Sequence, residues 1–243
     1  MGRIRLGTLP RTQKWDQVVG LVTRGADVEQ IAAASADAAE NTLERASQDE
    51  GLAHAFWLLI QILQAARQPN FPERLSELGL TVSSKPTLLE IVAAFTRAVD
   101  NHLSERGKRS DLGEMAQHAA AETILTLAGM DLPFLLRTNA SDVQDALAEL
   151  GTADRFTVVA RDFFSRLAGR SLGYFLGREL SKHVGPGKRF GAIDERSAFN
   201  AALDLHCRET SQIIKEYSDD WYGKILRVQS GTSHVTRRAP LRM

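Results

Sequence analysis

Apolar residues recur at three- and four-residue steps through almost the whole chain, which is the spacing of one face of an α-helix. The segment 87–106 shows the pattern best, because its apolar residues fall on one face: Leu88, Ile91, Val92, Phe95, Val99 and Leu103. No alternating run is long enough to build a sheet. The sequence therefore predicts an all-α protein, a multi-helix bundle of about eight or nine helices without significant sheet.

Helix-start signals precede several of these segments. In a capping box, the N-cap side chain accepts a hydrogen bond from the backbone three residues further on, where a Glu or Gln reaches back. The pairs that fit are Ser47 with Glu50, Thr87 with Glu90, Ser141 with Gln144 and, more loosely, Asp27 with Gln30. With the breaks at proline and glycine, they predict helices near 12–24, 27–46, 48–67, 71–79, 87–106, 111–129, 141–150, 154–183 and 195–222.

Composition narrows the class of protein. Lys and Arg total 30, as do Asp and Glu, so the formal net charge is zero and the basic field of a general nucleic-acid binder is absent. Cys207 is the only cysteine, which fits a reducing compartment. The first residues lack the apolar run of a signal peptide, and the most apolar stretch, 53–63, is far shorter than the roughly 20 residues that cross a bilayer. We expect a cytoplasmic protein with no membrane span and no nucleic-acid partner.

The pattern predicts one α-helical domain over residues 1–228. Pro69, Pro72 and the stretch 83–86 separate an N-terminal helical group, so residues 12–68 are a candidate for a looser layer within it. Residues 229–243 are different, because they are basic and contain no acidic residue. We expect them to form a flexible C-terminal tail, with docking on a partner as the alternative.

The segment 154–183 carries an unusual row of small residues. Ser165, Gly169, Gly173, Gly177 and Ser181 follow one another at four-residue steps and so lie along one line of a helix. Each interior glycine costs a helix about 0.8–1 kcal/mol relative to alanine, and close approach of another helix commonly offsets that cost. We expect the row to receive a helix. It comes either from this chain, with alanines 119–121 or 32–34 as candidates, or from a second copy or a foreign subunit.

Acidic residues and histidines at helical spacing indicate a second, less favoured site. Glu114, His118 and Glu122 are four residues apart, and His183 and His206 lie in later helical segments. Helical bundles can hold metals through such side chains, but the Glu-x-x-His pattern of di-iron proteins is absent. We therefore predict no metal, cofactor or catalytic residue. The plainer interpretation makes His183 a helix-end residue, His206 a core histidine and Glu122 the partner of an arginine.

Three stretches resemble a group of bacterial helical proteins. They are residues 178–190 (Arg-Glu-Leu-Ser-Lys-His-Val-Gly-Pro-Gly-Lys-Arg-Phe), residues 199–209 and the pair Trp221-Tyr222. The similarity extends over most of the chain up to about Tyr222, and the tail departs from it. No biochemical activity is attached to that group, so the resemblance implies a bacterial origin and nothing about mechanism.

Taken together, these patterns favour a non-catalytic protein-interaction subunit or adaptor of a bacterial cytoplasmic multiprotein system, of which a defence system is one example. The sequence contains no convincing nucleophile, phosphate-binding loop or metal-ligand set, while grooves of small residues and a basic tail suit docking of a protein partner or a second copy. The alternative is a helical-bundle enzyme, or a ligand- or metal-binding protein, with an internal pocket of these Glu and His side chains.

Overall fold

The computed structural model describes residues 12–46, 49–106, 109–130, 132 and 139–209, and within these ranges it contains nine α-helices and no β-strand. The expected all-α bundle is confirmed. The helices are α1 (Gln13–Arg24), α2 (Val28–Ala46), α3 (Glu50–Ala66), α4 (Phe71–Glu77), α5 (Leu88–Glu105), α6 (Asp111–Met130), α7 (Ala140–Leu150), α8 (Ala153–Lys182) and α9 (Ile193–Glu209). None of these helices is both long enough and apolar enough to pass through a bilayer.

Capping explains where several helices begin. Thr87 and Asp27 accept hydrogen bonds from the backbone N–H three residues further on, at 3.2 and 2.8 Å, as expected. Two expected starts are wrong. Asn139, not Ser141, is the N-cap of α7, and Asp49 is the N-cap of α3. Nearby side chains of similar capping strength compete at these positions, so the local pattern places a start only to within a turn. The expected continuation of the last helix to residue 222, and the tail 229–243, lie outside the described residues.

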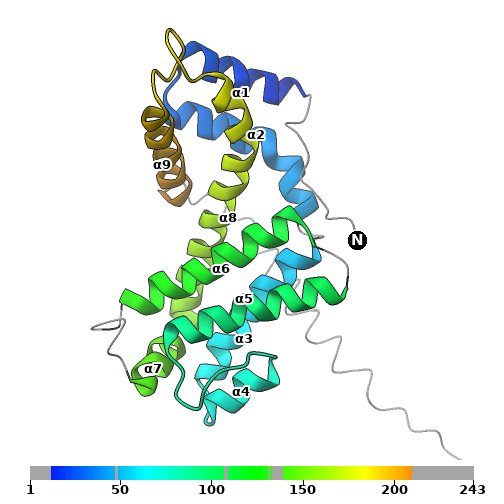
Figure 1. Ribbon diagram of the computed structural model, residues 1–243, viewed down its shortest axis with the longest axis vertical. Helices are drawn as coiled ribbons and strands as arrows, with labels where there is room; N and C mark the ends of the chain where they lie inside the picture. The colour runs from blue at the N-terminus through cyan, green and yellow to red at the C-terminus, as the bar shows by residue number, and fades with distance from the viewer. Residues whose placement is uncertain (1–11, 47–48, 107–108, 131, 133–138, 210–243) are drawn as a thin grey trace, which may run out of the picture.

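The apolar side chains form two hydrophobic clusters. Helices α3–α7 and the first half of α8 build the larger lobe, in which the rings of Phe56 and Phe163 lie 4.8 Å apart. Helices α1, α2, α9 and the second half of α8 build the smaller lobe, in which the rings of Trp15 and Phe175 lie 5.4 Å apart. Figure 1 shows the two lobes one above the other, with α8 passing from one into the other. Of the segment 12–68, α1 and α2 therefore pack in the smaller lobe and α3 in the larger.

Helices α3 and α6 meet backbone to backbone at a pair of glycines. A Cβ atom on Gly51 would lie 2.8 Å from the Cα of Gly113, and a Cβ on Gly113 would lie 3.0 Å from the Cα of Gly51. No real side chain tolerates such separations, so only glycine permits this crossing. Small residues do bring helices together in this protein, but at a pair that no pattern in the sequence indicated.

The loop between α8 and α9 is tied to the end of α1. The Arg189 guanidinium donates to the backbone carbonyls of Val22 at 3.2 Å and Ala26 at 2.5 Å. It also lies over the rings of Phe190 and Phe199, 5.3 and 5.2 Å from their centroids. A cation at a helix C-terminus satisfies carbonyl groups that have no partner within the helix, so Arg189 has a structural role in the smaller lobe.

Candidate functional site

The Arg166 guanidinium is the centre of a polar seam between α6 and α8. It donates to Asp162 at 2.6 Å, to Glu122 at 3.1 Å and to the Thr126 hydroxyl at 2.9 Å, and Thr123 donates to the same Asp162 carboxylate at 2.8 Å. Burial opposes the charge of Arg166, but hydrogen bonds and the charges of the two carboxylates outweigh it and raise the pKa. This arginine is a fixed cation that holds α6 against α8, not a group that exchanges protons.

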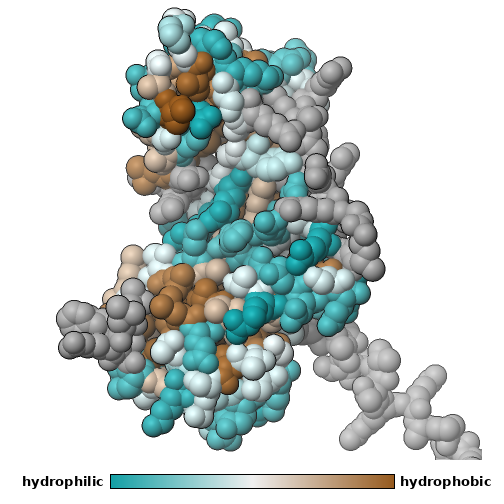
Figure 2. Space-filling view, viewed as in Figure 1, coloured by the Kyte–Doolittle hydropathy of each residue, from teal (hydrophilic) through white to brown (hydrophobic). Residues whose placement is uncertain are grey.

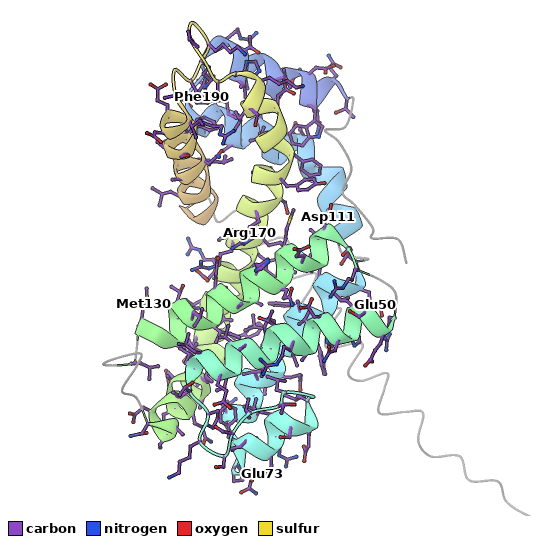
Figure 3. All side chains as sticks on the ribbon, viewed as in Figure 1. Glu50, Glu73, Asp111, Met130, Arg170 and Phe190 are labelled. Carbon is purple, nitrogen blue, oxygen red and sulfur yellow. The ribbon has the colours of Figure 1, made fainter. Side chains whose placement is uncertain are left out.

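The seam continues toward the smaller lobe. Arg170 also binds Glu122, so the pairing of Glu122 with an arginine expected from the sequence is confirmed. One turn further along α8, the Tyr174 hydroxyl donates to Asp111 at 3.0 Å. Figure 3 shows Arg170 where α8 passes α6 and Asp111 at the beginning of α6, and Figure 2 shows hydrophilic residues across this part of the surface.

The other Glu and His side chains of the expected pocket have different surroundings. Glu114 and His118 are exposed on α6. His183 follows the end of α8, with its Nε2 atom 3.5 Å from a carboxylate oxygen of Glu179. His206 lies in the last turn of α9, about 20 Å along that helix from its first residue, Ile193. Among the described residues, no three His, Cys, Asp or Glu side chains are grouped so that they could hold a metal ion.

The row of small residues runs down α8, which is one continuous helix through all of them. Ser165 and Gly169 are buried, Gly173 and Gly177 are half-buried, and Ser181 is exposed. A Cβ atom on Gly173 or Gly177 would meet nothing within 4 Å. In the described part of the chain, neither 119–121 nor 32–34 therefore fills the space beside these two glycines. Among the described residues, the space beside these two glycines is open.

A second polar cluster, which the sequence reasoning missed, lies where α3 and α5 meet. The rings of His54 and His102 stack in parallel with centroids 3.5 Å apart, and the centroid of the Trp57 ring lies 5.5 Å from that of His54. Glu50 lies 3.9 Å from the His102 Nε2 atom and accepts from Arg106 at 2.7 Å. Glu50 and His54 are four residues apart, which is the only local signal, because nothing in the spacing links either residue to α5.

Both imidazoles are shifted toward the neutral form. Burial, followed by the charges of His102 and Arg106, lowers the pKa of His54 from 6.5 to about 4. Burial and then the Arg106 charge lower the pKa of His102. Two protonated rings in face-to-face contact would repel each other, so protonation of both rings destabilises this stack.

Comparisons of the chain with protein-family models, with curated proteins and with solved structures find no match. Bacterial origin, drawn from the resemblance of residues 178–190 and 199–209, therefore stays a prediction. The case for a function rests on the seam, the open row on α8 and the surface of the described helices.

The histidine stack predicts a specific loss of stability in acid. The folded pKa of His54 is about 4 and its ordinary value is 6.5, so the unfolded chain binds more protons between these limits and stability falls as the pH is lowered through that window. With a discount for partial exposure, we expect His54 to account for about 1–2 kcal/mol. Urea unfolding of wild type and His54→Gln at pH 7 and pH 4.5 measures this difference.

The His118→Gln variant is the matched control, because its imidazole is exposed on α6. It is expected to keep the acid sensitivity of the wild type, whereas His54→Gln is expected to lose part of it. Equal acid sensitivity in wild type and His54→Gln would show that the stack does not titrate with folding.

Proposed function

We propose that this chain is a non-catalytic protein-interaction subunit or adaptor of a bacterial cytoplasmic multiprotein system, and that a partner helix docks on α8 and α9 of the smaller lobe. The observation that carries the proposal is the open space beside Gly173 and Gly177. Two interior glycines cost α8 about 2 kcal/mol relative to alanine. In the described part of the chain, no helix packs into the space that the missing side chains leave beside these two glycines.

The neighbouring helix supports the same surface. Ile193 and Leu205 of α9 are 63% and 55% exposed, and α9 packs against the half of α8 that carries the two open glycines. Single exposed aliphatic residues are ordinary. On the helix that packs against this half of α8, however, they add exposed apolar area of the kind that a docked helix buries.

The polar groups of the seam support a structural role for the rest of α8. Arg166, Arg170, Asp162 and Glu122 pair with one another. Ion pairs of this kind fix the relative position of two helices. The pairs of Arg166 therefore hold the first half of α8 against α6, which supports a structural role for them.

The Gly177→Leu variant tests the proposal. The added side chain enters open space, so we expect an unchanged helical circular dichroism spectrum together with loss of the complex. The complex is measured by co-purification with the co-expressed products of adjacent genes, and by light scattering after size exclusion for a second copy. Gly20→Leu on α1 is the matched control, because its Cβ would also meet no backbone within 4 Å. The proposal fails if folded Gly177→Leu keeps every association, or if the wild type is a monomer that binds none of these proteins.

A further inference from the structure

Helix α8 is the described element that belongs to both lobes. Leu167 is the last of its residues in the larger hydrophobic cluster and Leu172 is the first in the smaller one. Helices α1, α2 and α9 make their main contacts with one another and with α8, and α3–α7 do the same on the other side. Residues 168–171, which we call the waist, therefore join two separately packed cores.

In the described part of the chain, three polar side-chain contacts join the waist and the next turn of α8 to α6. Arg170 binds Glu122, Tyr174 donates to Asp111 at 3.0 Å, and the Ser171 hydroxyl lies 3.8 Å from the sulfur of Met115. Each contact of this kind is worth about 1 kcal/mol net, because water can replace it when the groups separate. Two lobes separated along this plane would lose little free energy compared with the separation of either core.

The backbone of α8 is weakest at the same place. Gly169 and Gly173 bracket the waist, and each lowers local helix propensity by about 1 kcal/mol relative to alanine. Helices bend most readily at glycine and serine, and Ser171 lies between the two glycines. Among the described residues, no atom lies within 4 Å of the place that a Cβ on Gly173 would take, so none of them blocks a bend there.

We propose that α8 is a hinge helix, that the smaller lobe swings relative to the larger one by bending between Gly169 and Gly173, and that the contacts of Arg170 and Tyr174 with α6 latch the arrangement seen here. This motion does not depend on the proposed partner, because it follows from two cores, a polar plane and a glycine-bracketed helix. The latch is reversible, since the Arg170 and Glu122 side chains are 34% and 44% exposed and water solvates them when the lobes separate; motions of this kind occur in microseconds to milliseconds.

Spin-label distance measurements test the hinge in the full chain. Labels are placed at exposed positions on α1 and α7 through Gln17→Cys and Asp145→Cys in a Cys207→Ser background, so that one label reports on each lobe. A pair within the larger lobe, Arg97→Cys with Asp145→Cys, gives the width expected for a rigid body. We expect the inter-lobe distribution to be about twofold wider than this reference, and wider again in Glu122→Gln/Tyr174→Phe.

Two alanine variants locate the bend. Gly173→Ala is expected to narrow the inter-lobe distribution, because alanine stiffens the helix beside the waist. Gly177→Ala adds the same side chain in equally open space one turn away, inside the smaller lobe, and is expected to leave the width unchanged. If the double variant Glu122→Gln/Tyr174→Phe does not fold, the inter-lobe width is measured in Tyr174→Phe alone. The proposal is overturned if the inter-lobe width equals the rigid reference in both wild type and latch variants, or if the two alanine variants behave alike.

Discussion

Arg166→Ala is expected to lower the free energy of unfolding by about 3 kcal/mol, the largest effect of any polar substitution considered. The arginine side chain is 7% exposed and that of Asp162 is 20% exposed, so the variant leaves a largely buried carboxylate without its cation. Breaking a buried ion pair in this way costs about 3–5 kcal/mol. The lower end of this range applies to Arg166→Ala, because the Glu122 side chain is 44% exposed and water solvates its carboxylate.

Urea unfolding followed by circular dichroism measures the effect, with Arg170→Ala as the control. The Arg170 side chain is 34% exposed, and its removal is expected to cost about 1 kcal/mol or less. A combined Arg166→Met/Asp162→Leu variant is expected to recover part of the loss, because no lone charge remains buried. If Arg166→Ala unfolds within experimental error of the wild type, the seam does not hold α6 against α8.

Alanine substitutions at four glycines are expected to have opposite effects. Gly51→Ala and Gly113→Ala should each destabilise by about 2–3 kcal/mol, because the new Cβ would lie 2.8 or 3.0 Å from a backbone Cα of the facing helix and the helices must move apart. Gly173→Ala and Gly177→Ala should each stabilise by about 0.5–1 kcal/mol, because alanine is the better helix former and nothing lies within 4 Å of the new atom.

The same urea titrations compare all four variants at one pH. Destabilisation by Gly173→Ala or Gly177→Ala would mean that something fills the space beside them, and tolerance of Gly51→Ala would mean that α3 and α6 are not in backbone contact. If the expected signs are found, the two glycines of α8 weaken the isolated fold. We then expect Gly173 and Gly177 to serve a purpose other than stability of the fold. That purpose is either docking, which Gly177→Leu tests, or bending, which Gly173→Ala tests.

These two uses of α8 are separable by experiment. A docked helix needs the surface of Gly177 but not a flexible waist, so Gly177→Leu should abolish association without changing the inter-lobe width. A hinge needs a flexible waist but no partner, so Gly173→Ala should change the width of the isolated chain. Failure of one result leaves the other standing, because the two variants lie a full helical turn apart.

Helix positions followed closely from the sequence. The expected helix over 87–106 is α5, Leu88–Glu105, and the expected 154–183 is α8, Ala153–Lys182. Amphipathic period and capping are both encoded within a few neighbouring residues, so they need no knowledge of the rest of the chain. Starts shifted by one or two residues, in the case of Asn139 because adjacent side chains compete for the same role.

Tertiary structure alone decided which elements meet. The sequence indicated the small residues of α8 as a row that receives a helix, yet in the described residues a close backbone approach lies between Gly51 and Gly113, while Gly173 and Gly177 are open. It also stacks His54 on His102, two residues without any local relation. A residue's own helix depends on neighbours a turn away, which the sequence displays. The residue that it contacts on another helix depends on how all the helices pack into the two hydrophobic clusters. No short stretch of sequence contains that information.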